Sequence, residues 1–482
     1  MAFAITQTCC ADASCVSVCP VNCIHPTPDE PDFGTTEMLY VDPAACIDCG
    51  ACADACPVDA IFPAGDLTGP LRAYEEINAE YYAGRDVLAE ATAAPNFHRW
   101  SPPSFARVLP SDFAPLDVAV VGTGPAGMYA VEDLLLHTNS RVTLIDRLPA
   151  AGGLIRYGVA PDHPSTKKIG EKFARFHDHP RLRLRLGTEA GPELAERHDA
   201  VIYAVGATQA RRLGVPGEDL PGSLPAATVV NWYNGHPGVR PAAVDLSAER
   251  VVVVGTGNVA LDIARILTAA PESLAATSLA PAALTRLRAS KVREVVLLAR
   301  RGPDDAAYTR SELLALAARG ELVVDAHDPR IAAAIDAGDG KAAWLRGLPR
   351  EPVDWSAPPP DGRRVVLRFH SAPVAFTGDT EVRGVAASGP AGEIEILAGR
   401  VVRAAGFRGA PVAGLPFDEE TGTVPNVSGR VAPGTYVAGW IKRGPSGGIG
   451  ANKACARETV GALLEDAVAG RLRTRRRGLL RR

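Results

Sequence analysis

Four cysteines between positions 46 and 57 have the spacing of iron–sulfur ligands. The run reads C-I-D-C-G-A-C-A-D-A-C-P, which matches the pattern C-x2-C-x2-C-x3-C-P at every position. Three closely spaced thiolates can bind three irons of one cluster, and the cysteine before the proline usually ligates a second cluster. Zinc sites tend to use two separated C-x2-C pairs instead. The spacing therefore predicts iron–sulfur chemistry and a partner run nearby.

An internal repeat supplies that partner run. Residues 56–63 read C-P-V-D-A-I-F-P and repeat residues 19–26, which read C-P-V-N-C-I-H-P, after 37 positions (56 − 19 = 37). The same offset aligns Cys46 with Cys9 rather than with Cys10. The predicted ligands are therefore Cys9, Cys15, Cys19, Cys46, Cys49, Cys52 and Cys56.

Two positions depart from the repeat. Cys23 aligns with Ala60, so we expect it to be a small buried residue and not a ligand. Cys49 aligns with Asp12, so one half of the repeat has a carboxylate in place of a thiolate.

Residues 1–65 resemble a two-cluster bacterial-type ferredoxin. The resemblance implies one four-iron cluster held by Cys19, Cys46, Cys49 and Cys52, and a second cluster held by Cys9, Cys15 and Cys56. Asp12 departs from the family pattern. A weak carboxylate ligand to a fourth iron and a three-iron cluster both fit this position, and the sequence does not choose between them.

The length and composition describe a multidomain globular protein. A chain of 482 residues has room for roughly three domains. No apolar run is long enough for a transmembrane helix, and the N-terminus lacks the features of a signal peptide. Nine of the ten cysteines precede position 57, which favours metal ligation in a reducing cytoplasm over disulfides.

Charge is distributed unevenly along the chain. Residues 1–65 contain nine acidic residues and no Lys or Arg, which leaves 51 basic and 46 acidic residues (55 − 9 = 46), a net +5, elsewhere. Opposite charges favour electrostatic docking, although acids also keep small domains soluble. We interpret the Arg-rich tail, 471–482, as a solvated helix end and expect no nucleic-acid or membrane partner.

A dinucleotide-binding fingerprint begins at residue 117. An apolar strand leads into G-x-G-x-x-G at Gly122, Gly124 and Gly127, and a helix is expected over 128–136. A second strand, 141–146, ends in Asp146, 24 residues after Gly122. Such glycines let the backbone approach a pyrophosphate, and the acid accepts a hydrogen bond from a ribose hydroxyl. The alternative is a glycine-rich turn of another doubly wound sheet.

A second fingerprint begins at residue 250. It contains Gly255 and Gly257, and alanine replaces the third glycine, which the pattern permits. The next strand, 292–299, ends in Arg300 and Arg301, where an NAD site would usually place an acid. Two guanidinium groups suit the 2′-phosphate of NADP, although a solvated strand end would look the same. An Ala/Pro/Ser-rich insertion near 269–290 explains the long spacing of 45 residues (300 − 255).

Further apolar segments complete the expected sheets. Strands are predicted over 199–207, 365–369, 392–402 and 434–439. The last strand precedes a glycine-rich turn at 444–450 and a helix over 452–466. That turn can present backbone N–H groups to a cofactor, although an ordinary turn would have the same composition.

Most of residues 113–465 resemble adrenodoxin reductase. The motifs are R-Y-G-V-A-P-D-H-P at 156–164, W-Y-N-G-H-P at 232–237, G-N-V-A at 257–260, R-R-G-P at 300–303 and G-W-I-K-R-G-P at 439–445. With the N-terminal segment included, the whole chain resembles the mycobacterial-type ferredoxin/ferredoxin–NADP reductase fusion.

The resemblance implies roles for individual residues. Flavin adenine dinucleotide (FAD) is expected to contact the first glycine turn and several later residues. The full set is Gly122, Gly124, Ala126, Gly127, Asp146, Leu154, Trp440, Gly447, Gly448 and Ile449. NADP contacts are expected at Gly257, Asn258, Val259, Ala260, Arg300, Arg301, Glu312 and Gly447. The family usually has a larger apolar residue at position 448. His163 is a candidate catalytic residue near the flavin, and a structural hydrogen-bonding histidine is an equal alternative.

We therefore expect two doubly wound α/β nucleotide-binding domains and a small α+β ferredoxin-like domain. The predicted order is a ferredoxin domain, a linker, an FAD-binding domain in two parts with the NADP-binding domain between them, and a basic tail: 1–65, 66–112, 113–228, 229–400, 401–465 and 466–482. The linker is expected to contain a helix over 71–94.

The predicted function is transfer of electrons from NADPH through FAD to the clusters and then to a protein acceptor. A separate ferredoxin or a cytochrome P450 is the expected kind of acceptor. An NADPH-dependent flavin monooxygenase would also carry two nucleotide sites but would not need the cysteines. A redox sensor is the non-enzymatic alternative.

Overall fold

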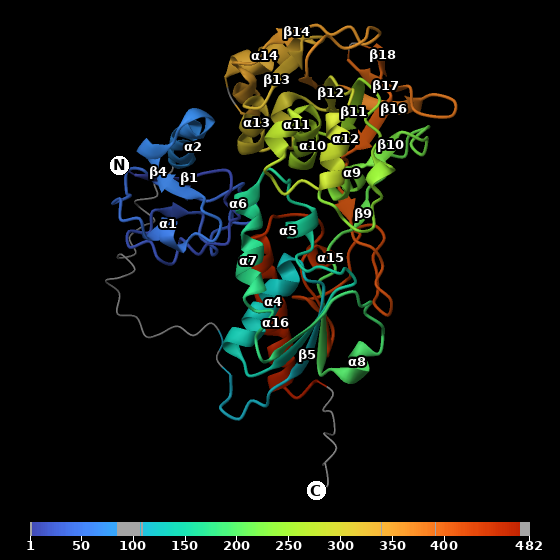
Figure 1. Ribbon diagram of the computed structural model, residues 1–482. Helices are drawn as coiled ribbons and strands as arrows, with labels where there is room; N and C mark the ends of the chain where they lie inside the picture. Colours follow the sequence, from blue (N-terminus) through green and yellow to red (C-terminus); the bar gives the residue numbers. More distant parts are fainter. Residues whose placement is uncertain (1, 84–106, 108, 339, 391, 473–482) are drawn as a thin grey trace. The chain divides into compact units, whose positions relative to one another are not determined.

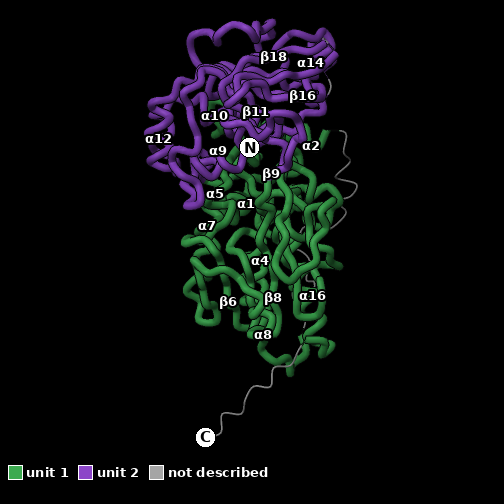
Figure 2. Tube along the Cα trace, turned by 90° about the vertical axis from the view of Figure 1, so that its right-hand side faces the viewer, with its two compact units in different colours: residues 1–159, 165–209, 407–482 green, residues 160–164, 210–406 purple. Residues whose placement is uncertain are grey.

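The computed structural model describes residues 2–83, 107, 109–338, 340–390 and 392–472, which form two compact units (Figure 1). Unit 1 comprises residues 1–159, 165–209 and 407–482, and unit 2 comprises 160–164 and 210–406 (Figure 2). Unit 1 contains the cysteine-rich segment together with the first fingerprint. Unit 2 contains the second.

The cysteine-rich part of unit 1 consists of two small antiparallel strand pairs and short helices. β1 pairs with β4 in register Phe3 to Pro63, and β2 pairs with β3 in register Ile24 to Val41. The elements are β1 (Phe3–Ile5), β2 (Ile24–His25), β3 (Tyr40–Val41), α1 (Ala51–Ala55), β4 (Ile61–Pro63), the 3-10 turns η1 (Ala64–Asp66) and η2 (Gly69–Arg72), and α2 (Ala73–Tyr82).

Helix α2 belongs to this part because a buried asparagine ties it to two strands. The Asn78 side chain accepts hydrogen bonds from the backbone N–H groups of Ile5 (3.1 Å) and Val41 (2.9 Å). It donates to the carbonyl oxygens of Ile5 (2.8 Å) and Tyr74 (2.7 Å). The contacts of the cysteine-rich part therefore extend beyond the predicted boundary at 65. The remainder of the predicted linker helix, from residue 84, lies outside the described residues.

The second part of unit 1 is a six-stranded sheet in the order β21-β22-β8-β5-β6-β7. All neighbours except β21 and β22 are parallel, and the central strands are buried, as continuous apolar runs predict. Helices α4 and α16 pack against each other. The elements are β5 (Asp117–Val121), α4 (Pro125–His137), β6 (Arg141–Ile145), α5 (Leu154–Tyr157), α6 (Pro164–Lys167), α7 (Ile169–Ala174), β7 (Leu182–Arg185), α8 (Leu194–Arg197), β8 (Ala200–Tyr203), β9 (Gln209–Ala210), β20 (Phe407–Arg408), β21 (Arg430–Ala432), β22 (Thr435–Val437), α15 (Trp440–Arg443) and α16 (Ala451–Val468).

Unit 2 contains a seven-stranded sheet in the order β10-β19-β11-β12-β15-β13-β14 and a separate three-stranded antiparallel sheet, β16-β17-β18. All neighbouring strands of the larger sheet are parallel. The elements are β10 (Ser223–Pro225), α9 (Ala226–Tyr233), η4 (Pro241–Ala243), β11 (Arg250–Val254), α10 (Asn258–Thr268), α11 (Pro271–Leu274), α12 (Pro281–Arg288), β12 (Glu294–Leu298), η5 (Pro303–Asp305), α13 (Arg310–Ala317), β13 (Glu321–Asp325), α14 (Pro329–Ala337), η6 (Lys341–Leu345), β14 (Arg350–Glu351), β15 (Arg364–Arg368), β16 (Ala372–Thr377), β17 (Gly384–Gly389), β18 (Gly392–Leu397) and β19 (Arg400–Arg403).

The structure divides the second half of the chain differently from the sequence prediction. The segment 392–402 forms two strands in different sheets, since β18 pairs with β17 and β19 pairs with β11. Unit 2 begins near 210 and ends near 406, because β10 and β19 pair with each other inside its large sheet. The insertion at 269–290 contains the short helices α11 and α12.

In the part of the chain that the structure describes, none of the helices is both long enough and apolar enough to cross a membrane.

Replacing Asn78 with alanine should loosen the cysteine-rich part. The change leaves the amides of Ile5 and Val41 and the carbonyl of Ile5 without this partner, and an unsatisfied buried group costs about 1–3 kcal/mol. We expect amide hydrogen exchange in β1 and β3 to become about a hundredfold faster, which corresponds to about 3 kcal/mol. Glu75→Ala, at an exposed position of the same helix, is the control and should exchange like the wild type.

Candidate functional site

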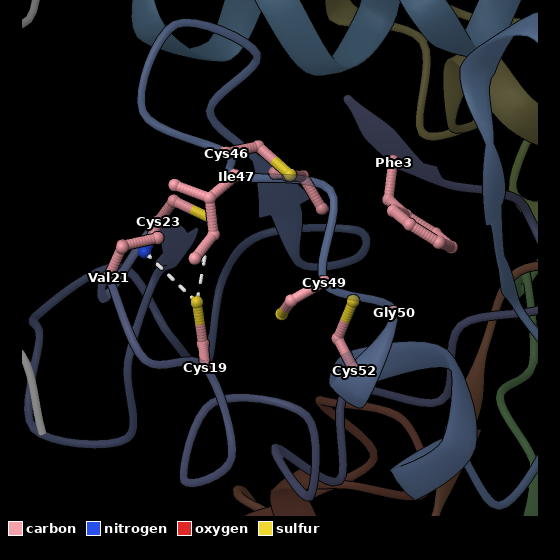
Figure 3. A pocket seen from close by; sticks show the side chains of 10 residues that line it. Phe3, Cys19, Val21, Cys23, Cys46, Ile47, Cys49, Gly50 and Cys52 are labelled. Atoms are coloured by element: carbon pink, nitrogen blue, oxygen red, sulfur yellow. Dashed lines mark hydrogen bonds between the residues drawn. The ribbon is translucent and has the colours of Figure 1, made fainter. Parts of the chain in front are cut away.

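One cavity of unit 1 gathers four of the predicted ligands. Cys19 comes from the first half of the repeat, whereas Cys46, Cys49 and Cys52 come from the second, and all four line the same space (Figure 3). Cys23 also lines it, with its sulfur 3.5 Å from the sulfur of Cys19. Cys23 is buried, as the sequence predicted. The set that the ferredoxin resemblance implied is therefore brought together.

A second cavity gathers Cys9, Cys15 and Cys56, together with Cys10 and Asp12. Asp12, which the repeat places at the fourth position, and Cys10, the alternative to Cys9, therefore border the same space.

Asp12 is already held by other side chains of unit 1. Its carboxylate accepts hydrogen bonds from the backbone N–H (3.1 Å) and the hydroxyl (2.6 Å) of Ser14. The Lys172 ammonium group lies 3.6 Å from Oδ2. These contacts hold the Asp12 side chain in place at the cavity, where its carboxyl oxygens could still serve as weak ligands to iron.

Burial favours the neutral form of most of these thiols. It raises the pKa of Cys9 to about 11 and that of Cys52 to about 11, and it also raises the pKa values of Cys15 and Cys56. The Cys19 pKa is lowered to about 6, chiefly because Cys23 hydrogen bonds to its sulfur. Cysteine ligates metals as the thiolate, so metal binding at the buried thiols must displace protons.

Two of the three glycines of the first turn leave no room for a side chain. A Cβ at Gly122 would collide with the carbonyl oxygen of Ala204, and one at Gly127 would collide with the carbonyl oxygen of Gly122. Gly122 also has φ of +107°, which favours glycine. Gly124 has open space at its Cβ position. The turn lies between β5 and α4 at the carboxyl end of the sheet, where doubly wound folds bind nucleotides.

Asp146 lies at the same edge and is buried. Its Oδ2 accepts hydrogen bonds from the backbone N–H (2.9 Å) and hydroxyl (2.5 Å) of Thr123, and its Oδ1 accepts one from the N–H of Leu148 (2.9 Å). A carboxylate offers about four acceptor positions. Asp146 can therefore fix the glycine turn and still accept a ribose hydroxyl through Oδ1.

The return strand β22 delivers the remaining FAD candidates to this edge. Gly439 packs so tightly on Ala126 that a Cβ there would lie 2.6 Å from the alanine Cβ. The Trp440 indole donates to the carbonyl oxygens of Ser446 (3.1 Å) and Gly447 (3.2 Å), which ties the tryptophan to the glycine-rich turn.

The glycine-rich turn itself is partly open. Gly448 is exposed, and its carbonyl accepts a hydrogen bond from Asn452 (2.9 Å), while Ile449 is half-buried. Leu154, on the short helix α5, is an exposed large apolar residue, as expected of a residue that contacts a ligand.

In unit 2, the predicted NADP candidates of the second fingerprint lie at the carboxyl edge of the large sheet. Gly257 precedes α10, and Asn258, Val259 and Ala260 form its first turn. β11 and β12 are parallel neighbours, so Arg300, which follows β12, lies at the same edge. Both Arg300 and Arg301 are exposed, and Arg301 pairs with Asp305 (3.4 Å). Gly447, by contrast, belongs to unit 1.

A buried arginine organises the rest of the unit 2 site. The Arg265 guanidinium donates to Asp162 through Nε (2.8 Å) and Nη2 (3.2 Å), to Asp262 (2.5 Å) and to Glu312 (3.0 Å). Its Nη2 also lies 2.5 Å from Nε2 of His163. The segment 160–164 is thereby fixed to α10, which explains why it belongs to unit 2.

This contact defines the state of His163. A guanidinium only donates, so Nε2 of His163 must accept and its proton must lie on Nδ1. Burial and the Arg265 charge both lower the His163 pKa. The arrangement suits the hydrogen-bonding role, and the catalytic role of His163 stays a prediction.

Ligand atoms of His163, Asp262 and Glu312 lie within 4.8 Å of one another, a spacing at which three residues could hold a metal ion. Arg265 already donates to all three, so a cation occupies the centre of this group. The residues therefore do not fit a metal site.

Two features were not predicted from the sequence. Arg265 and Asp262 stand at i and i−3 on the helix after the second fingerprint, and this spacing is the available sequence signal. The other is a contact between the cysteine-rich segment and the start of α16, where Gly450 donates its N–H to the carbonyl of Cys10 (2.8 Å). No local pattern could indicate it, since 440 positions separate the two residues (450 − 10).

Comparison with known protein families supports both parts of the chain. Residues 116–302 match the family described as pyridine nucleotide-disulphide oxidoreductase, and residues 39–62 match the 4Fe-4S binding domain. The second match includes the cysteines at 46, 49, 52 and 56.

Individual relatives match over nearly the whole chain. A probable ferredoxin/ferredoxin–NADP reductase of Mycobacterium tuberculosis is 46% identical over 98% of this chain and 85% of its own length. The protein of that name from Mycobacterium leprae is 45% identical over 98% of this chain and 87% of its own. A solved structure of M. tuberculosis FprA in complex with NADPH superposes with a TM-score of 0.68 at 39% identity, covering 75% of this chain and 87% of that one.

The buried Glu312 should make stability depend on pH. Burial, followed by the Asp262 charge, raises its pKa from 4.5 to about 8. Between these values the folded chain retains a proton that the unfolded chain has lost, so this group contributes stability at low pH that is lost as the pH rises towards 8. The loss approaches about 1.4 kcal/mol per pH unit within this window.

Glu312→Gln mimics the protonated side chain and should therefore remove this part of the decline. The measurement is the free energy of unfolding in urea at several pH values between 5 and 8. Glu321→Gln changes an exposed carboxylate of the same unit and should follow the wild type. Parallel pH profiles for Glu312→Gln and the wild type would show that Glu312 ionises at its ordinary pKa.

Proposed function

Because this chain belongs to the ferredoxin/ferredoxin–NADP reductase family, we propose that it is an NADPH-dependent flavoprotein reductase that passes electrons to its own iron–sulfur clusters and then to a protein acceptor. The observation that carries the proposal is the presence, in one chain, of two strand–glycine-turn–helix units and two cysteine-lined cavities. The nucleotide-binding units would hold the two-electron carriers, NADPH and FAD, and the cysteine-lined cavities would hold the one-electron carriers, the iron–sulfur clusters.

The residues around the first turn fit FAD. The space at Gly124 leaves the backbone open to a pyrophosphate at the start of α4, and Asp146 has acceptor capacity for a ribose. Trp440, Leu154 and the turn 447–449 supply apolar and backbone contacts. When bound, the flavin would accept a hydride from NADPH and release electrons singly.

The residues around the second turn fit NADP. The start of α10 offers backbone N–H groups to a pyrophosphate, and exposed Arg300 and Arg301 can bind a 2′-phosphate. Glu312 stands on α13, whose first residues are tied to α10 because Asn258 accepts a hydrogen bond from the N–H of Thr309 (2.9 Å).

The two cysteine cavities fit two clusters. We assign Cys19, Cys46, Cys49 and Cys52 to a four-iron cluster, and Cys9, Cys15 and Cys56 to a second cluster with three or four irons. A separate ferredoxin or a cytochrome P450 would be a suitable one-electron acceptor, in the cytoplasm where thiols stay reduced.

Anaerobic titration with NADPH should bleach the flavin absorbance and produce electron paramagnetic resonance (EPR) signals of reduced clusters.

Arg300→Ala/Arg301→Ala should lose several orders of magnitude in kcat/KM for NADPH and little for NADH, since each charge-assisted phosphate contact contributes about 1.5–3 kcal/mol. Arg383→Ala, at an exposed site of the three-stranded sheet region, is the control for lost charge.

Other outcomes of the NADPH titration and of the variant measurements would favour other functions. Peroxide or hydroxylated product without cluster reduction would indicate a flavin monooxygenase, and negligible turnover with every acceptor would favour a redox sensor. An unchanged nucleotide preference in the double variant would make the arginine pair ordinary surface charge.

Asp12→Cys should stabilise a four-iron form of the second cluster. Mild oxidation of the wild type should give the EPR signal of a three-iron cluster, and the variant should resist this change because a thiolate holds the fourth iron more tightly. Cys10→Ser tests the neighbouring thiol in the same cavity and should behave like the wild type. If only Cys10→Ser altered the spectrum, the ligand assignment from the repeat would be wrong.

A further inference from the structure

The loop that carries Cys9 and Cys15 packs against the start of helix α16. The backbone N–H of Gly450 donates a hydrogen bond to the carbonyl oxygen of Cys10 (2.8 Å). The Lys453 ammonium group, one turn further on, donates to the carbonyl oxygen of Asp12 (2.9 Å). Both acceptors are backbone atoms, so these bonds fix the path of the loop and leave its side chains free to face the cavity.

Position 450 needs a glycine because of this packing, and not because of its backbone conformation. A Cβ at position 450 would collide with the carbonyl oxygen of Ala11, whereas φ of −64° and ψ of −38° are ordinary helical values that any residue adopts. The missing side chain therefore serves the approach of the cysteine loop.

Lysines from the second part of unit 1 face acids of the cysteine-rich part. Lys172 lies 3.6 Å from the Asp12 carboxylate, and Lys168 pairs with Asp59. Lys172 also stands 5.9 Å from the ring centroid of Tyr129, on the helix that begins at the first glycine turn. The contact thus involves α4, α7 and α16.

The start of α16 also connects the cysteine loop to the residues that are predicted to contact the flavin. Gly450 directly follows the turn 447–449, and Trp440 donates a hydrogen bond to Gly447 (3.2 Å). Two hydrogen bonds, from Trp440 to Gly447 and from Gly450 to Cys10, and the short backbone between Gly447 and Gly450 therefore link Trp440 to Cys10.

From this juxtaposition we infer the order in which the two clusters receive electrons. The cluster held by Cys9, Cys15 and Cys56 is the first acceptor of electrons from the flavin site, and the cluster held by Cys19, Cys46, Cys49 and Cys52 is the exit. Gly450 and Lys453 are the residues that position the loop of the first cluster. The inference rests on the proposed function. In the net reaction NADPH becomes NADP+ and H+, and its two electrons reduce two clusters by one electron each.

Paired variants of the full chain test the order of the clusters. Cys15→Ala removes a ligand of the proposed entry cluster, and Cys49→Ala removes one of the proposed exit cluster. With Cys15→Ala, NADPH should no longer reduce the remaining cluster, although dithionite should. With Cys49→Ala, NADPH should still reduce the remaining cluster. Freeze-quench EPR and iron content are the readouts.

Contact variants test the docking while retaining every ligand. Gly450→Ala and Lys453→Ala should keep the iron content and the reduction by dithionite. The rate of cluster reduction relative to flavin reduction should fall in the same sample, and the peptide containing residues 9–15 should exchange amide hydrogens faster. Arg457→Ala removes an exposed cation one turn along the same helix and should match the wild type in both measurements.

The outcomes separate the two hypotheses. If NADPH reduces neither the flavin nor any cluster of the wild type while dithionite reduces the clusters, the proposed function fails. If NADPH reduces both clusters but Cys15→Ala leaves the exit cluster reducible at the wild-type rate, the proposed order is wrong. Should either ligand variant lose all iron, Gly450→Ala decides: an unchanged ratio of rates with unchanged exchange overturns the inference.

Discussion

Close approach of backbone to backbone at glycine turns is the constraint on which both nucleotide-binding sheets depend. At Gly122 and Gly127 a single methyl group would collide with a carbonyl oxygen, and at Gly255 it would lie 2.6 Å from the carbonyl oxygen of Ala404. The turn after β5 in one sheet and the turn after β11 in the other are therefore compact enough for the next helix to begin at once. Because β22, β8, β5 and β6 are parallel, as are β11 and β12, the candidate residues that follow them gather at one edge of each sheet.

The arginines of unit 2 have two different roles. In unit 2, Arg265 is buried and donates to the side chains of Asp162, Asp262 and Glu312, so it stabilises a fixed arrangement around His163. Removing one partner from such a group leaves an uncompensated buried charge, which costs far more than an exposed pair contributes. Arg300 and Arg301 are exposed, and their charge remains available to a ligand.

Much of this arrangement follows from local sequence patterns. The strand at 250–254 and the helix after it occur where the fingerprint predicted them, and the four cysteines of Figure 3 converge as the repeat and the resemblance implied. These features depend on residue spacing within short segments. The attachment of α2 to the cysteine-rich part has no such local signal, because Asn78 makes its contacts with Ile5 and Val41, which lie 73 and 37 positions away.

The unit boundaries and the Arg265 group depend on pairing at similar range. The sequence shows that 392–402 favours strands but not that β18 and β19 join different sheets. It shows Asp162 and Asp262 in separate motifs but not that one guanidinium joins them. Specific tertiary partners, unlike periodicity, leave no local signal in one sequence.

The contact between the cysteine loop and α16 shows how a fused electron carrier can be held without depending on its net charge. The nine acids of residues 1–65 suggest electrostatic attraction, but exposed ion pairs such as Lys168 with Asp59 are screened by salt and contribute little. The Gly450 hydrogen bond and the fit of Ala11 over that glycine depend on shape and backbone, which salt does not screen. Charge would then govern how fast the two parts meet, while the glycine governs the register in which they rest. Because α16 begins at the predicted flavin turn, that register places the loop between Cys9 and Cys15 beside it.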